Sequence, residues 1–293
     1  MGRKPLIYGI SPLLRSYMTW HKNIFTVDEG KYHYVSVPFT WLVGRAIQAC
    51  QAAEKRGLTP IVGGPGALLM HKELREWDVQ EQCPSFFFAD MLRIHNPHAS
   101  RATHGCPNHC PFCINQRKDF AELPEFCPRP IMCDDNFLEA SLPFVEMAID
   151  RLQDLPVVDF NQGLSASLFT GKKAELLTRL PFDVLRFAFD SVNVESSVVK
   201  AIELAFSLGF HKIHCYVLVG FNDTVDDALY RVRLLESLGV VPVPMRYQPL
   251  NTMKKNAYVS PLWDEAELKK FTRYWSRRIW TQYIPYDQFD NSR

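Results

Sequence analysis

The chain has 293 residues, and 47% of them are hydrophobic, so it can bury the core of one large domain or of a large and a small one. Its formal net charge of +1 gives no overall electrostatic attraction to nucleic acid or to a membrane surface. A protein of this net charge can still carry a local basic groove that binds nucleic acid. No apolar run approaches the roughly 20 residues that cross a bilayer, which argues against a membrane protein.

Residues 1–97 have the pattern of a small α/β unit. The expected strands are Leu6–Ile10, Tyr32–Val37 and Leu58–Val62. A helix is expected from an N-cap at Thr40 to Arg56, with Gly57 as its stop. The run Gly63-Gly64-Pro65-Gly66 then predicts a tight turn rather than a phosphate loop, because it lacks the lysine and the spacing of a P-loop.

Three cysteines follow within eight residues: Cys106, Cys110 and Cys113, spaced Cys-x3-Cys-x2-Cys. Three thiolates can hold three irons of a 4Fe-4S cluster and leave the fourth iron open to a ligand that is not protein. Gly105 allows a sharp turn out of the preceding strand, and Phe112 places an aromatic ring between the second and third ligands. Eight cysteines without an apolar N-terminal segment favour a reducing, cytoplasmic setting, in which thiols bind metals.

Spacing alone implies only a metal, and a zinc site with His104 or His109 as fourth ligand is the alternative. Zinc modules usually bring a second Cys-x2-Cys or histidine pair, and none is visible. Cys127 and Cys133 are not expected to bind a second cluster, because two ligands are too few. Cys215 lies in an alternating apolar strand and is expected in the core.

Residues 98–293 alternate strands with helical periodicity and predict an α/β fold, a partial (β/α)6 TIM-like barrel. The expected strands are Ala99–Thr103, Pro130–Cys133, Val157–Asn161, Val184–Phe189, Lys212–Val219 and Val243–Gln248. A helix capped by Thr224 follows the fifth strand, and a last helix is expected over Asp264–Trp280. Its aromatics, interleaved with arginines, are expected to close the barrel, with nucleic-acid binding as the alternative.

Catalytic groups of such barrels lie at the carboxyl ends of the strands, which directs attention to the polar residues there. They are Asp134, Asp135 and Asn136 after the second strand, Asn161 and Gln162 after the third, and Arg186 and Asp190 at the fourth. Arg186 could pair with Asp159, with Asp190 or with a ligand carboxylate. Arg246 and Gln248 share one face of the sixth strand, and a buried arginine there needs an anion or a salt bridge.

The form Gly-Cys-Pro-x-x-Cys-x-Phe-Cys, at residues 105–113, resembles the radical S-adenosylmethionine (radical SAM) superfamily, in the branch of methylthiotransferases and cobalamin-dependent enzymes. The resemblance implies that the cysteines hold a 4Fe-4S cluster whose open iron binds S-adenosylmethionine. An electron then cleaves this cofactor to methionine and a 5′-deoxyadenosyl radical, which abstracts a substrate hydrogen. The resemblance further implies a flavodoxin-like or ferredoxin-like electron donor.

By the same resemblance, the Asp134–Phe137 segment would hold the methionine ammonium and the backbone at Gly220 would contact adenine. Asn161, Gln162, Arg186 and Arg246 are candidates for the ribose or for carboxylates. The full expected cofactor site is Phe112, Asp134, Asp135, Asn136, Asn161, Gln162, Arg186, Asp190, Gly220 and Arg246.

The N-terminal unit resembles a shortened cobalamin-binding domain of this superfamily. Its first strand is followed by Ile10-Ser-Pro-Leu-Leu-Arg and not by Asp-x-His-x-x-Gly, so cobalamin is not expected. The substrate is not specified by the sequence. Isomerisation, rearrangement, methyl or methylthio transfer and nucleobase modification all stay open, and a non-enzymatic zinc or iron-sulfur module is the alternative.

Overall fold

The computed structural model describes residues 9–80, 91–115, 118–276, 281 and 283–290. The chain divides into two compact units. The larger one comprises the chain up to Tyr17, Ser100–Tyr247 and the chain from Val259, and the smaller one comprises Met18–Ala99 and Gln248–Tyr258. The expected division into 1–97 and 98–293 differs at three places, because the chain up to Tyr17 belongs to the larger unit, whereas residues 98–99 and 248–258 belong to the smaller one.

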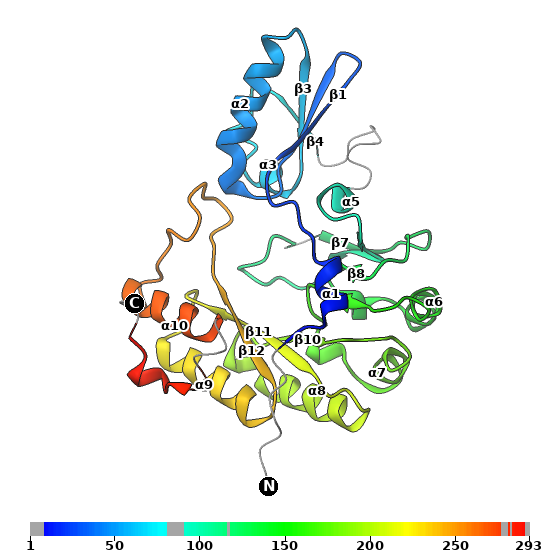
Figure 1. The fold of residues 1–293 in the computed structure, drawn as a ribbon, viewed down its shortest axis with the longest axis vertical. Helices are drawn as coiled ribbons and strands as arrows, with labels where there is room; N and C mark the ends of the chain where they lie inside the picture. The colour runs from blue at the N-terminus through cyan, green and yellow to red at the C-terminus, as the bar shows by residue number, and fades with distance from the viewer. Residues whose placement is uncertain (1–8, 81–90, 116–117, 277–280, 282, 291–293) are drawn as a thin grey trace. The chain divides into compact units, whose positions relative to one another are not determined.

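The smaller unit is a four-stranded sheet with helices beside it (Figure 1). The strands, in spatial order, are β1 (Phe25–Glu29), β2 (Tyr32–Ser36), β3 (Thr59–Gly63) and β4 (Asp78–Gln80). β1 is antiparallel to β2, whereas β2, β3 and β4 run parallel. The helices are η1 (Thr40–Leu42), α2 (Val43–Glu54), α3 (Pro65–Leu69) and α5 (Met91–His95).

The predicted strand–helix–strand pattern is confirmed, since β2, α2 and β3 form a parallel βαβ unit. Helix α2 buries Val43, Ala46, Cys50 and Ala53 against the sheet residues Val35 and Val62. Thr40 is not the helix N-cap, because it is a buried residue inside η1. The first expected strand, Leu6–Ile10, falls mostly outside the described residues, and Gly9 and Ile10 are not in a strand.

The glycine run after β3 lets two backbone segments meet. Gly64 has φ +100°, and a Cβ atom there would lie 2.7 Å from Val37 O. A Cβ atom on Gly66 would lie 2.5 Å from Phe39 C, and the Gly66 amide donates to Val37 O at 2.9 Å. The turn therefore packs directly on the chain after β2, which agrees with the tight turn expected from the sequence.

The larger unit contains two three-stranded sheets and a hairpin. One sheet is β5 (Ala99–Ser100), β8 (Ile131–Met132) and β9 (Asp159–Phe160), and the other is β10 (Leu185–Ala188), β11 (Ile213–Val219) and β12 (Val241–Arg246). β8 is parallel to β9, and β10, β11 and β12 are parallel to one another. The hairpin pairs β6 (Thr103–Cys106) with β7 (Lys118–Glu122).

The fold is thus mixed α/β, with several small sheets and no closed barrel in the described part of the chain. The two three-stranded sheets adjoin. Val158 forms a parallel bridge with Phe182, and the Leu164 amide donates to Arg186 O at 2.8 Å. All six strands expected in this half are present, although β12 lies at Val241–Arg246 and not at Val243–Gln248, and β8 and β9 are each only two residues long. The first strand, β5, is also shorter than the expected Ala99–Thr103. It stops at Ser100 because the Ala102 and Thr103 amides both donate to Asp134 Oδ1.

Helices of this unit cover the sheets with amphipathic faces. They are α1 (Pro12–Tyr17), α6 (Leu142–Leu152), α7 (Gly171–Leu177), α8 (Glu195–Ser207), α9 (Val225–Ser237) and α10 (Glu265–Ser276), with short turns η2 (Phe137–Glu139), η3 (Ala166–Leu168), η4 (Val192–Val194) and η5 (Tyr286–Gln288). Helix α9 lies against β11 and β12 (Figure 1). Thr224 caps α9 through a capping box with Asp227, as the sequence predicts.

The last helix, α10, contributes aromatic residues to the core. Asp264 caps it by accepting the Ala266 and Glu267 amides at 2.8 and 3.1 Å. Phe271, Tyr274 and Trp275 are buried and pack on the aromatic rings of Tyr286 and Phe289. These rings therefore belong to the hydrophobic core of the larger unit. The predicted end of this helix, residues 277–280, lies outside the described residues.

Across the described ranges, no helix combines the length and the apolar character that a membrane crossing requires.

Candidate metal and cofactor site

The three cysteines lie at the end of β6 and in the loop that connects β6 to β7. Cys106 is the last residue of β6 and pairs with Lys118 of β7 after a shift in register that follows His104. We call residues 105–115 the cysteine loop. Gly105 has φ +79°, so the sharp turn expected there is present. The Cys113 amide donates to Cys110 O at 3.0 Å, which folds the loop back on itself. All three thiols are half-buried.

The thiols lie within electrostatic reach of one another and of two carboxylates. Burial raises the pKa of the Cys110 thiol, and the charges of Cys113, Asp190 and Cys106 raise it further. Burial likewise raises the pKa of Cys113, with Cys106, Asp135 and Asp190 adding to it and the Asn115 amide opposing it. Negative charge accumulates here when the thiols ionise, and a bound cation would relieve it.

The residues present fit an iron-sulfur cluster by the chemistry of their donors. Three thiolates are soft ligands of the kind that such clusters take. In the described part of the chain, no three His, Cys, Asp or Glu side chains come together closely enough to hold a single metal ion. His104 Nδ1 lies 3.0 Å from Arg101 Nη1 and 3.5 Å from Asp135 Oδ2, and His109 is exposed.

Asp134 follows β8 and is turned into the protein. Its Oδ1 accepts hydrogen bonds from the Ala102 amide at 2.8 Å, the Thr103 amide at 2.6 Å and Thr103 Oγ1 at 2.9 Å. Burial raises the pKa of Asp134 to about 6, although these hydrogen bonds oppose the shift. Oδ2 is buried without a partner among the described residues. One oxygen thus fixes the start of β6 and the other is free to accept a hydrogen bond.

Asp135 points the opposite way and joins the two ends of the cysteine loop. Its Oδ2 accepts from the Gly105 amide at 2.8 Å, and its Oδ1 accepts from Asn115 Nδ2 at 2.6 Å. The Asn115 amide in turn donates to Cys113 Sγ at 3.4 Å. The sequence could not say which aspartate faces the cysteines, and the geometry assigns that place to Asp135.

Asn136 contacts a cysteine directly. Its Nδ2 lies 3.6 Å from Cys106 Sγ, within hydrogen-bond range for sulfur, and its side chain is buried. Its Oδ1 has no partner among the described residues. The carboxyl end of β8 therefore supplies three successive polar side chains, two of which hold or touch the cysteine loop.

Aromatic rings connect the cysteine loop to the ends of β11 and β12. The Phe112 ring meets the Phe221 ring edge-on at 5.8 Å, and Phe221 lies 4.6 Å from the Tyr247 ring. Gly220 has φ +77°, and a Cβ atom on it would lie 3.1 Å from Leu268 Cδ1. Its amide donates to Asp223 Oδ1 at 2.9 Å. The predicted residues Phe112 and Gly220 therefore lie in one neighbourhood.

A buried arginine that sequence analysis missed organises this end of the unit. Arg231 donates to Phe189 O and Leu218 O, both at 2.9 Å, and its Nη2 is 2.5 Å from Asp223 Oδ2. Burial raises the pKa of Asp190 to about 6, with the Leu218 backbone and the charge of Arg231 opposing. Arg231 lies on the buried face of α9 together with apolar residues. Its position on this apolar face was the one feature of the sequence that could have indicated a buried arginine.

Arg186 pairs with Asp159 inside the larger unit, one of the partners expected for it. Arg186 Nε lies 2.6 Å from Asp159 Oδ1, and both side chains are buried. Tyr216 places its ring 6.0 Å from the guanidinium carbon and donates its hydroxyl to Asn161 O at 2.8 Å. Burial raises the pKa of Asp159, and the charge of Arg186 opposes this. Arg186, Asp159 and Asn161 form one polar group.

The remaining predicted residues are less involved. Gln162 is exposed, and Arg246 is half-buried at the end of β12, where burial lowers its pKa and Glu265 opposes the shift. Gln248 belongs to the smaller unit and accepts the Asn256 amide at 2.7 Å, so it fixes a loop.

The other cysteines in the described part of the chain differ in their burial. Cys127 is exposed, whereas Cys133 is buried and its pKa is raised by burial to about 12. Cys215 is fully buried in the core, as predicted. Cys83 lies outside the described residues.

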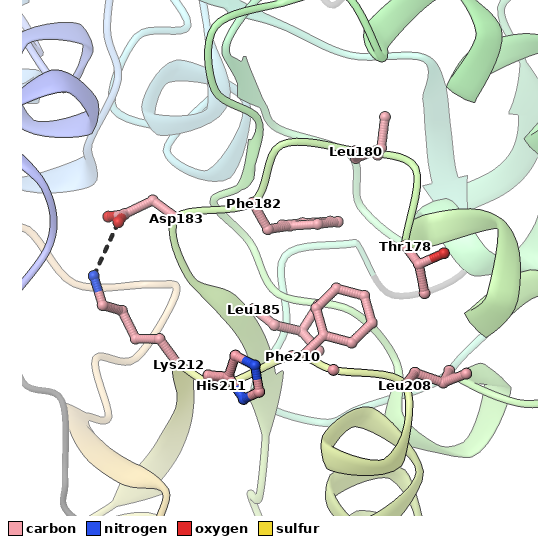
Figure 2. A pocket seen from close by; sticks show the side chains of 10 residues that line it. Thr178, Leu180, Phe182, Asp183, Leu185, Leu208, Phe210, His211 and Lys212 are labelled. Carbon is pink, nitrogen blue, oxygen red and sulfur yellow. Dashed lines mark hydrogen bonds and ion pairs between the residues drawn. The ribbon is translucent and has the colours of Figure 1, made fainter.

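A cavity of about 270 Å³ lies at the amino-terminal ends of β10 and β11, whereas the polar candidate residues follow the carboxyl ends of the strands (Figure 2). Its lining comes from the first residue of β10 and from the segments that precede the two strands: Thr178, Leu180, Phe182, Asp183, Leu185, Leu208, Gly209, Phe210, His211 and Lys212. Lys212 Nζ and Asp183 Oδ1 form an ion pair of 2.9 Å. Since the polar candidates follow the strands, this cavity is separate from the cysteine loop site.

No protein-family model matches the chain. A search of curated proteins also finds no match.

Proposed function

We propose that this chain is a radical SAM enzyme, in which Cys106, Cys110 and Cys113 hold a 4Fe-4S cluster. The observation that carries the proposal is the arrangement around the cysteine loop. Asp135, from the carboxyl end of β8, accepts hydrogen bonds from both ends of that loop. A loop of three thiols is thereby held beside the strand ends at which a barrel enzyme of this class binds its cofactor.

We also propose the finer fold, a partial (β/α)6 barrel. Its six strands in spatial order would be β5, β8, β9, β10, β11 and β12. The support is the parallel pairing within each three-stranded sheet and the contacts of Leu164 with Arg186 and of Val158 with Phe182 between them. With this order, Asp134, Asn161, Asp190 and Gly220 all follow their strands on the same side of the barrel.

When bound, the cluster supplies the electron that cleaves S-adenosylmethionine to methionine and a 5′-deoxyadenosyl radical. The protein's own residues bind and orient the cofactor. Asp134 Oδ2 and Asn136 Oδ1 are buried acceptors without partners among the described residues, which suits them to the ammonium group. Arg186 and Arg246 are the candidate partners for a carboxylate, and the paired rings of Phe112 and Phe221 would shield the bound cofactor from water.

The same proposal extends to partners and location. A flavodoxin-like or ferredoxin-like protein would supply the electron, and the enzyme would act in the cytoplasm. Cobalamin is not part of the proposal, because the motif that carries its histidine ligand is absent from the N-terminal unit. Isomerisation, rearrangement, methyl or methylthio transfer and nucleobase modification are the candidate outcomes for the substrate.

Anaerobic reconstitution with iron and sulfide tests the proposal against a zinc module. We expect a brown protein with about four irons and four sulfides per chain, because three thiolates with an open position assemble such a cluster. The matched control is reconstitution with zinc in place of iron. A colourless protein that takes up one zinc ion and no iron would contradict the proposal.

A further inference from the structure

Asn136 places an amide N–H against the sulfur of one predicted cluster ligand. Its Nδ2 lies 3.6 Å from Cys106 Sγ. A thiolate only accepts hydrogen bonds, so the NH₂ end of the amide is the end that belongs beside the sulfur. Asn115 makes a similar contact, but through its backbone amide, at 3.4 Å from Cys113 Sγ. A side-chain substitution can therefore remove the donor of Asn136, whereas the backbone donor of Asn115 stays in place.

The side chain of Asn136 is held in place by its surroundings. Asn136 is only 5% exposed and sits at the start of η2, where its carbonyl accepts the Glu139 amide at 3.1 Å. The next residue, Phe137, is buried against the Phe160 ring at 4.6 Å. Because Asn136 is buried and its backbone is held in this turn, its side chain has little freedom to move away from the sulfur.

Hydrogen bonds to the sulfurs are one of the terms that set the reduction potential of an iron-sulfur cluster. Reduction adds negative charge that is shared by the sulfurs, and an N–H donor stabilises this charge more in the reduced state than in the oxidised state. We propose that Asn136 is a positioning residue that raises the reduction potential of the cluster through Cys106 Sγ. This inference rests on the proposed function, because it requires the 4Fe-4S cluster.

The test is a redox titration of the reconstituted full-length protein. The electron paramagnetic resonance signal of the reduced cluster reports the fraction reduced at each potential. Asn136→Leu keeps much of the volume and removes the donor, and Asn136→Asp keeps the shape and places a carboxylate oxygen there. We expect the leucine variant to shift the reduction equilibrium about tenfold toward the oxidised form, or about 59 mV for one electron. The aspartate variant should shift it further.

Thr103→Val is the matched control. It removes the bond from Thr103 Oγ1 to Asp134 at a fully buried position without touching a thiol. We expect full iron content and an unchanged potential, because no donor to sulfur is lost. An equal shift in this control, or wild-type potentials in both Asn136 variants, would overturn the inference.

Iron content separates the other outcomes. If one Asn136 variant fails to assemble the cluster, the other decides the question. If neither assembles it while wild type does, Asn136 is a structural residue and the inference is wrong. If wild type itself takes up no iron and sulfide, the proposed function fails, and the inference fails with it.

Discussion

The Gly105 amide donates a 2.8 Å hydrogen bond to Asp135 Oδ2, so the residue before the first cysteine is held by the turn after β8. The second oxygen of the same carboxylate holds Asn115 at the far end of the cysteine loop. The loop between them carries all three thiols. Asp135 is therefore a preorganising contact: it fixes the loop before any metal binds.

We expect Asp135→Ala to lower the iron that reconstitution incorporates. Each hydrogen bond to an ionised carboxylate contributes roughly 1.5–3 kcal/mol, and both are lost. The loop then samples conformations in which its thiols do not converge. Iron and sulfide per chain are the measurement, and Asp150→Ala, on the exposed face of α6, is the control with the same chemical change. Wild-type iron content in Asp135→Ala would show that the loop is ordered without this carboxylate.

Asp134 should make the stability of the metal-free protein depend on pH. Its pKa is raised from 3.8 to about 6, so the folded protein keeps a proton that the unfolded chain has already lost. The free energy of unfolding therefore falls as pH rises from about 4 to about 6, by about 3 kcal/mol from this group. Urea titrations of wild type and Asp134→Asn over this range isolate the effect, which should vanish in the variant. Parallel pH profiles would mean that Asp134 titrates normally.

Replacing Arg231 should destabilise the larger unit strongly. Arg231→Met removes the donor to Asp223 Oδ2 and to two backbone carbonyls, and breaking a buried ion pair in this way typically costs about 3–5 kcal/mol. Arg233→Met is the matched control, because Arg233 is exposed on the same helix. Chemical denaturation measures both. A loss below about 1 kcal/mol in Arg231→Met would show that the network reorganises around the vacancy.

The smaller unit is expected to bind no cobalamin. In place of the histidine motif the chain begins helix α1, which belongs to the larger unit, and the Ser11 amide donates to Asp183 Oδ2 of the same unit at 2.7 Å. Protein produced with the vitamin supplied should purify without its absorption spectrum. Stoichiometric pigment after gel filtration would refute this prediction and imply a ligand other than that histidine.

Several elements could be predicted from the sequence because their signals are local. Apolar runs located β11 and β12, and Thr224 and Asp264 were recognised as helix caps from their spacing to the following turn. Strand β1 could not be found in this way. All five of its residues are exposed, so it has no buried face and no alternation to read.

The three cysteines could be singled out from the sequence because their close spacing is a local feature. The contacts that hold the cysteine loop could not be predicted in this way. Which of Asp134 and Asp135 faces the cysteine loop depends on the backbone amides that β6 presents, and these are distant in sequence. Arg231 was missed because an arginine in an amphipathic helix usually lies on its solvent face. Its partners come from the residue after β10, from β11 and from the turn that follows β11.

The most direct test of the central proposal is the release of 5′-deoxyadenosine from S-adenosylmethionine by the reconstituted, chemically reduced protein. We predict release by wild type and by Cys127→Ala, which loses an exposed thiol outside the site. Release should be abolished in Cys106→Ala, Cys110→Ala and Cys113→Ala, together with the cluster. Cys215→Ala, in the core, should keep its iron. Wild-type protein with a full complement of iron and sulfide that releases no 5′-deoxyadenosine would contradict the assignment as a radical SAM enzyme.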